Sequence, residues 1–111
     1  MPKLMPSDIK DEVKDVLENM RSRGHSYLTA YQILERLPDT TRDRLIAERG
    51  VPGLKSGNYY AAANVVSDAA EMISNIEISF LETSSLSITL KDGTDITPGN
   101  ANVGLYRLLN H

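Results

Sequence analysis

Residues 27–73, YLTAYQILERLPDTTRDRLIAERGVPGLKSGNYYAAANVVSDAAEMI, decide the fold of this 111-residue chain. Apolar residues recur at helical spacing in three parts of this stretch. Pro38 separates the first part from the second, because a proline disfavours helical geometry at the residue before it. A segment rich in glycine, 50–58, separates the second part from the third. The pattern therefore predicts three helices, over about 29–37, 39–49 and 59–73.

Residues that favour helix ends stand at the boundaries of these segments. Thr29 and Asn58 are suited to cap the first and third helices at their N-termini, and Asp39, Thr40 or Thr41 the second. Gly50 suits the left-handed position that often ends a helix. The third helix is rich in alanine on its apolar face, which indicates that another element packs closely against it.

A further helix precedes this stretch. Ser7 is the predicted N-cap and Gly24 the stop, with acidic residues in the first turn and arginines in the last. The apolar residues form one stripe along the helix, with charged residues on the other face. That stripe consists of Ile9, Val13, Val16, Leu17 and Met20.

The apolar period changes from helical to alternating after residue 75. Segments 76–80 and 86–90 alternate around Ser84-Ser85, which predicts a β-hairpin. Asp92-Gly93 predicts a tight turn into a strand at 94–97, and 103–109 reads as the last strand after a Pro-Gly-Asn loop. The sequence thus predicts one α+β domain, with three or four N-terminal helices (about 7–73) packed on a C-terminal antiparallel sheet of three or four strands, a β-meander over about 76–109.

Composition excludes several classes of function. The chain has no cysteine, so disulfides and thiolate chemistry are excluded. No apolar run reaches the roughly 20 residues of a membrane span, and the first residues lack the apolar stretch of a signal peptide. These features predict a cytoplasmic protein with no membrane association.

The net charge of −3 argues against a strongly basic nucleic-acid binder, but its distribution is uneven. Residues 21–55 hold seven Lys and Arg against four Asp and Glu. The two short helices of 29–49 resemble a helix-turn-helix, and the hairpin downstream resembles a wing. An alternative function is therefore a winged-helix-like regulator that binds nucleic acid. Its candidate contacts are Arg42, Arg44, Arg49 and Lys55.

The usual glycine-bearing turn of a helix-turn-helix is replaced by Leu37-Pro38, and an extra helix stands before the strands. Asp43 and Glu48 also offset part of the positive charge. These departures favour a solvated helix face with intrahelical ion pairs over a nucleic-acid interface.

Tyrosines account for five of the six aromatic residues. Tyr31, Tyr59 and Tyr60 lie in the helical stretch, where a pocket between helices and sheet is a third hypothesis, with a small molecule as ligand. The structural alternative is that these rings are half-buried packing residues whose hydroxyl groups reach water.

No pattern indicates catalysis, a metal or a cofactor. The two histidines, His25 and His111, have no ligand-type spacing, and no serine stands in a nucleophile elbow. Asp68 and Glu71, three residues apart on one predicted helix, fit an exposed face better than a pair of catalytic acids. We therefore predict a protein that is not an enzyme.

The segments YLTAYQILERLP, RDRLIAERG and GNYYAAANVVSDAAEM, within residues 27–73, resemble small uncharacterised bacterial proteins of the kind carried on mobile gene cassettes. This resemblance implies a compact accessory protein, often a binding or assembly module and often oligomeric, and it assigns no functional residue. Together with the predicted strand edge and the alanine face, it favours a non-enzymatic interaction module that forms a homodimer, with a further protein partner unspecified.

Overall fold

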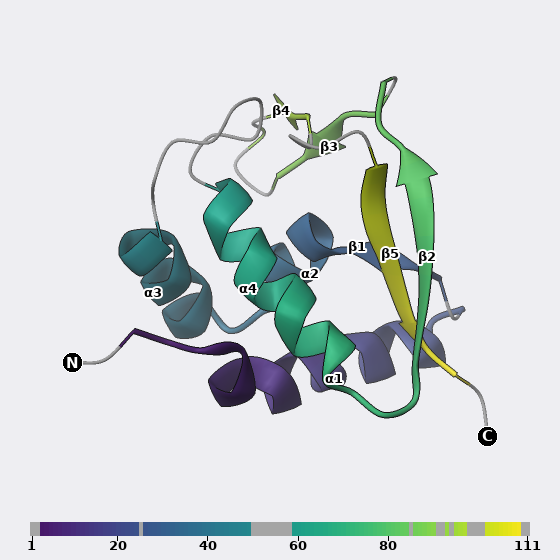
Figure 1. The fold of residues 1–111 in the computed structure, drawn as a ribbon, viewed down its shortest axis with the longest axis horizontal. Helices are drawn as coiled ribbons and strands as arrows, with labels where there is room; N and C mark the ends of the chain where they lie inside the picture. Colours follow the sequence, from purple (N-terminus) through teal and green to yellow (C-terminus); the bar gives the residue numbers. More distant parts are fainter. Residues whose placement is uncertain are drawn as a thin grey trace.

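The computed structural model describes residues 3–24, 26–49, 59–84, 86–90, 93, 95–97 and 102–109. Four helices come first and antiparallel strands follow, so the predicted α+β class is confirmed (Figure 1). The helices are α1 (Pro6–Ser22), α2 (Ala30–Arg36), α3 (Asp39–Arg49) and α4 (Tyr59–Glu71), and the strands are β1 (Leu28–Thr29), β2 (Ile76–Glu82), β3 (Ile88–Thr89), β4 (Asp95–Ile96) and β5 (Asn102–Leu108).

The N-cap of α1 is Met5, two residues before the predicted one. Ser7 is not the N-cap, because the helix already begins at Pro6, whose fixed φ suits the first helical position. The carboxylate of Asp8 accepts a hydrogen bond from the backbone N–H of Met5 at 2.9 Å. Side chains at the helical repeat, Ile9, Val13 and Leu17, are buried as the stripe predicts.

Thr29 caps α2 as predicted. Its hydroxyl accepts a hydrogen bond from the backbone N–H of Gln32 at 3.2 Å, and the Gln32 side chain accepts one from the backbone N–H of Thr29 at 2.8 Å. This reciprocal pair is a capping box. Leu37 is extended before Pro38, which ends α2 and allows α3 to begin at Asp39. The predicted capping and stop residues Asn58 and Gly50 lie outside the described residues.

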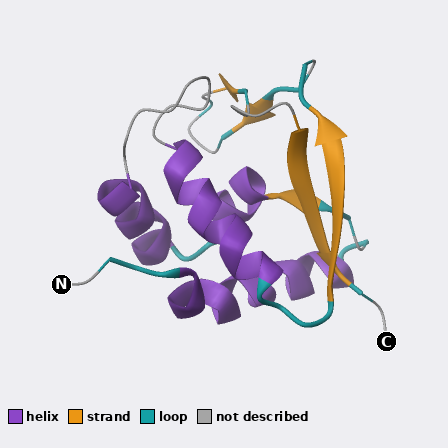
Figure 2. Ribbon diagram, viewed as in Figure 1, coloured by secondary structure: helices purple, strands orange, loops and turns teal. Residues whose placement is uncertain are grey.

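Helix α4 is at the centre of the helical layer and contacts α1, α2 and α3. Ala62, Val66, Ala69 and Ala70 are fully buried on its inner face. Small side chains let the neighbouring helices approach closely, as the alanine content predicted. Figure 2 shows the helices gathered on one side and the two long strands on the other.

The pairing of the strands differs from the predicted meander. Strand β5 is the middle of a three-stranded sheet with the order β1-β5-β2, and β3 pairs with β4 in a separate two-stranded sheet. The predicted hairpin between 76–80 and 86–90 is therefore wrong. Alternation shows which side chains share a face but not which strand is the partner. β5 offers β2 seven paired positions, whereas β3 is only two residues long.

Two local features of the strands complete the correction. Strand β1 was not predicted, because Thr29 was assigned only as a helix cap. Leu28 of β1 pairs with Tyr106 of β5.

The Asp92-Gly93 turn signal lies between β3 and β4. Gly93 has a φ of 88°, and its N–H donates to the carbonyl of Leu90 at 2.9 Å. The left-handed conformation of Gly93 and its hydrogen bond back to Leu90 agree with the predicted turn, while residues 91, 92 and 94 lie outside the described residues.

Gly104 provides a test of how the sheet packs on α4. A Cβ atom at this position would lie 2.6 Å from the Tyr106 hydroxyl oxygen, since the Tyr106 ring lies across the glycine. We expect Gly104→Ala to lower the free energy of unfolding by about 1–3 kcal/mol, because the ring must move. Urea denaturation followed by circular dichroism measures this. Asn102→Ala, at an exposed position of the same strand, is the control and should differ little from the wild type. Equal unfolding free energies for Gly104→Ala and the wild type would contradict this packing.

Candidate functional site

Exposed apolar side chains are concentrated around β2. Among the described residues, six large hydrophobic side chains are exposed; three lie on β2, and Met72 and Leu109 lie near its start. Met72 directly follows α4 and precedes β2, and the N–H of Leu109 donates to the carbonyl of Asn75 at 2.8 Å, just before the strand begins. The three on β2 itself are Ile78, Phe80 and Leu81. Clustered exposed apolar groups are typical of interaction sites.

β2 is an edge strand. One side pairs with β5 along all seven residues, and no strand among the described residues pairs with its other side. In Figure 1, β2 is the outermost element beside β5. Its backbone N–H and C=O groups on the outer side are therefore available to another strand.

The helical layer covers β5 but not the full width of β2. Ile76, Ile78 and Phe80 are paired with Leu108, Tyr106 and Gly104, so all six lie on the face that the helices cover. On β5, Leu108 and Tyr106 are buried. On β2, by contrast, Ile78 is 39% exposed and Phe80 is 71% exposed. An apolar strip thus runs from the core out to the edge of the sheet.

Tyr106 anchors this strip to α4. Its hydroxyl is hydrogen-bonded to the Ser67 hydroxyl on α4. Its ring lies across Gly104, and Gly104 is the residue of β5 that pairs with Phe80 of β2. Burial raises the pKa of Tyr106; the nearby carboxylates of Glu71 and Asp68 act in the same direction, and the Ser67 hydrogen bond opposes them. The phenol therefore stays neutral and joins the sheet to α4.

The opposite face of the sheet carries a charged pair. The Glu77 carboxylate accepts a hydrogen bond from the guanidinium of Arg107 on β5, and Arg107 also lies 4.2 Å from the centroid of the Tyr27 ring. This arrangement raises the pKa of Arg107, mainly through the hydrogen bond to Glu77. Glu77 is thus already paired and Glu82 ends the strand, which leaves Ile78 to Leu81 without charge.

β2 lacks the features with which proteins usually protect a strand edge. Its sequence, IEISFLE, contains no lysine, arginine, proline or glycine, and its pairing with β5 runs without a bulge. Natural edge strands are commonly protected by a lysine, a proline or a bulge, or by a covering element. An apolar edge of this kind is typical of interaction surfaces.

The arginines predicted to contact nucleic acid are engaged within the protein. Arg42 forms an ion pair with Glu35 of α2 and another, at 3.0 Å, with Asp43. Arg44 pairs with Glu48 one turn along α3 at 2.6 Å. Three arginines and three carboxylates alternate on α3, so the helix has no excess charge. Lys55 lies outside the described residues.

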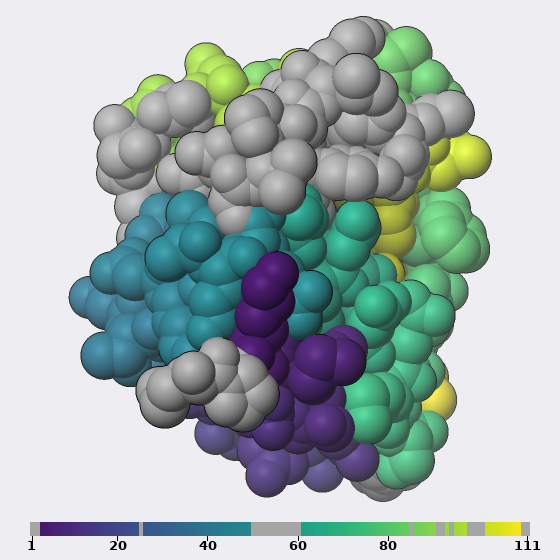
Figure 3. All heavy atoms as spheres, turned by 60° about the vertical axis from the view of Figure 1, so that its left-hand side comes forward, coloured from purple at the N-terminus to yellow at the C-terminus, as the bar shows by residue number. Residues whose placement is uncertain are grey.

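Arg49 and Glu48 hold the N-terminal segment instead of a ligand. The Arg49 guanidinium donates to the backbone carbonyl of Leu4 at 2.7 Å, and the Glu48 carboxylate accepts from the backbone N–H of Leu4 at 2.8 Å. The backbone N–H and C=O of Leu4 are thereby both hydrogen-bonded. Figure 3 shows the N-terminal segment lying on the surface beside α3.

The predicted tyrosine pocket is only partly described. Tyr31 is buried and lines a cavity of about 80 Å³ between α2, α4 and β5, together with Ala63, Ser67 and Tyr106. This volume is well below the roughly 300–1,000 Å³ of most small-molecule sites. The side chains of Tyr59 and Tyr60 lie outside what the structure describes.

Within the described part of the chain, no group of three or more His, Asp or Glu side chains is placed to hold a metal ion. The described helices include none that is both long and apolar enough to cross a membrane. Comparison of the chain with protein-family models, curated proteins and solved structures gives no match.

Sequence reasoning missed the residues of the β2 edge. The alternation of Ile76, Ile78 and Phe80 with polar residues predicts a strand, and the sequence predicts a free edge in the sheet without indicating which strand forms it. A usable signal was present in the absence of any cation or proline from IEISFLE, which is unusual for an edge strand. This signal has meaning only once the strand is known to lie at an edge.

The Glu35–Arg42 pair tests whether the arginines of α3 are structural. Their side chains are only 6% and 18% exposed. We expect Arg42→Ala to lower the free energy of unfolding by about 3 kcal/mol, because it removes a cation from beside a buried carboxylate. Arg44→Ala removes a more exposed pair on the same helix and should cost much less. Urea denaturation of the two variants measures the difference. Equal losses would contradict the structural role assigned to Arg42.

The contact between Glu48 and Leu4 predicts a pH dependence. The hydrogen bond from the Leu4 N–H, followed by that from Arg44, lowers the pKa of Glu48 below its usual 4.5. A lowered folded-state pKa stabilises the fold above the usual value, and this contribution is lost as the pH falls through the folded-state pKa. Glu48→Gln should therefore lose less stability than the wild type between about pH 6 and about pH 3. Urea denaturation at both pH values checks this, with Asp11→Asn on the exposed face of α1 as control. The same loss in Glu48→Gln and wild type would argue against the contact.

Proposed function

We propose that this protein is a non-enzymatic interaction module that assembles as a homodimer through the outer edge of β2. The observation that carries the proposal is the concentration of exposed apolar side chains on an unprotected edge strand. Strand addition at such an edge supplies main-chain hydrogen bonds, and the neighbouring side chains supply specificity.

A second copy of the chain fits this edge because the strand is complementary to itself. In an antiparallel pair with its two-fold axis at Ile78, Ile78 faces its own equivalent, and Ile76 of each copy lies opposite Phe80 of the other. Glu77 then faces Ser79, so no two carboxylates are directly opposed. Pairing of this kind covers Phe80 and satisfies the free backbone groups of both edges.

The expected dimer is weak. With its axis at Ile78 the ladder spans only residues 76–80 of each copy, which is a small interface compared with the roughly 1,200–2,000 Å² of stable complexes. We therefore expect association at micromolar or higher concentrations.

The nucleic-acid alternative has less support, since Arg42, Arg44 and Arg49 are engaged internally and α4, the helix that precedes β2, carries no Lys or Arg.

Substitution of Phe80 tests the proposal. Phe80→Lys places a charge on the edge and should convert a dimer at high micromolar concentration into a monomer, while the unfolding free energy changes little because the side chain is already exposed. Sedimentation equilibrium measures the mass. Thr40→Lys, at an exposed position of α3, is the matched control and should remain dimeric. A monomeric wild type at high micromolar concentration would refute the proposed dimer.

Single cysteines test the geometry independently. Because the chain has no cysteine, any disulfide in a single-cysteine variant must join two copies. Ile78→Cys should cross-link on mild oxidation, since residues at the two-fold axis lie about 4.5–5.5 Å apart between Cα atoms in an antiparallel pair. Ser22→Cys at the end of α1 should not. Equal cross-linking of the two variants would indicate random collision and count against pairing through β2.

A further inference from the structure

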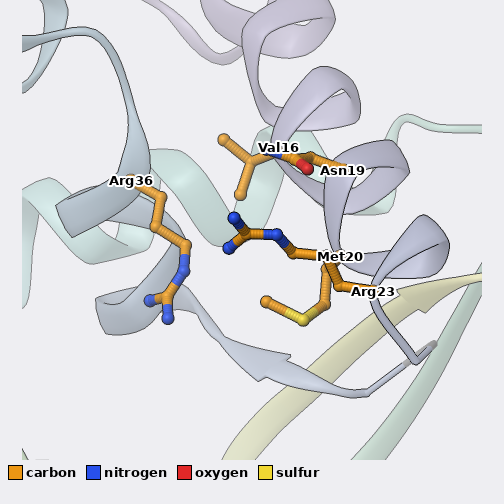
Figure 4. A pocket seen from close by; sticks show the side chains of 5 residues that line it. All are labelled: Val16, Asn19, Met20, Arg23 and Arg36. Carbon is orange, nitrogen blue, oxygen red and sulfur yellow. The ribbon is translucent and has the colours of Figure 1, made fainter.

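A second surface feature lies between α1 and α2 and includes no residue of β2. It is a depression of about 220 Å³, and Val16, Asn19, Met20 and Arg23 of the α1 region line one side of it, with Arg36 of α2 on the other. Figure 4 shows the guanidinium of Arg23 extending across the depression toward the Arg36 side chain, with the Met20 thioether beside it. This groove is the subject of the inference.

Among the described residues, no carboxylate forms an ion pair with either guanidinium group in the groove. Of the seven arginines in the chain, Arg21, Arg42, Arg44 and Arg107 form ion pairs within the described structure. Arg36 donates only to the backbone carbonyl of Gln32, at 3.2 Å, and no partner of the Arg23 side chain is found among the described residues. Two positive charges therefore line this depression, and neither forms an ion pair among the described residues.

The position of each arginine at the end of a helix can be explained separately, without a ligand. Arg36 lies in the last turn of α2, and Arg23 follows the last residue of α1, where positive charge interacts favourably with the helix dipole. The helix dipole favours a positive charge at any position around the end of the helix. It does not account for two guanidinium groups from different elements converging on one depression.

The wall of the groove is apolar. Val16 and Met20 are partly buried and pack against the core, so they present fixed hydrocarbon and thioether surface beside the charges. A second depression of about 310 Å³ shares Val16, Asn19 and Arg36 with the first and continues to Pro38, Glu12 and Asp15. The continuation carries two carboxylates, so only an uncharged end of an elongated ligand fits beyond the arginines.

We propose that this groove binds an organic carboxylate with a short apolar body. The carboxylate oxygens lie between the guanidinium groups of Arg23 and Arg36, which match a planar carboxylate through paired N–H donors. The apolar body lies along Val16 and Met20. This site is distinct from the β2 edge and does not depend on the dimer.

Hexanoate is a suitable probe, because it combines one carboxylate with a short alkyl chain. With protein labelled with ¹³C at its methionine methyl groups, the signal of Met20 reports directly on the groove, and those of Met5 and Met72 serve as internal controls. We expect a saturable shift of the Met20 signal and no comparable shift of the other two. Hexanol, which keeps the alkyl chain but lacks the charge, should bind much more weakly.

Three variants complete the test. Arg23→Gln and Arg36→Gln should each weaken hexanoate binding about tenfold, because each removes a charge-assisted hydrogen bond. Arg21→Gln is the matched control on α1, since its guanidinium is paired with Glu18 at 2.7 Å, and it should bind as the wild type does. Circular dichroism checks that all three variants fold. The proposal is overturned if hexanoate gives no saturable shift, if hexanol binds equally well, or if Arg21→Gln weakens binding as much as the other two.

Discussion

Close packing around α4 is the constraint on which the rest of the structure depends. Its inner face consists of alanine and valine side chains with no exposed surface, and α1, α2 and α3 all contact it. Such small side chains bring helix axes close together, and little room remains for the helices to slide or tilt. The Ser67 hydroxyl then joins the same helix to Tyr106 of the sheet. The helical layer and the sheet are therefore held in one arrangement.

The position of β2 follows from that of α4. Only four residues separate the end of the helix from the start of the strand, so the strand must begin beside the helix terminus. β5 occupies the position next to the helices, with Leu108 and Tyr106 buried, and β2 is left on the outside. The same packing that creates a dry core therefore leaves Phe80 and Ile78 beyond the helical layer. The edge proposed for assembly is a consequence of the topology and not a separate feature.

Charge is used mainly inside the molecule. Arg42 ties α3 to α2 through Glu35, and Arg49 ties α3 to the N-terminal segment. Charged side chains that hold elements together are largely desolvated or oriented, which makes them poor contacts for a polyanion. Arg23 and Arg36 differ because neither forms an ion pair with a carboxylate among the described residues. The distinction between internal and available arginines depends on which partner each side chain meets in space.

The sequence by itself determined the α+β class, the four helices and the turn at Gly93, because capping residues, proline and helical periodicity act within a few residues of the chain. It also determined which side chains of β2 share a face. Only the tertiary structure decided that β2 pairs with β5 and lies at an edge, that Arg42 meets Glu35, and that Arg23 and Arg36 share one groove. These relations join residues far apart in the chain. Strand partners and side-chain neighbours depend on how whole elements pack, and no local pattern contains that information.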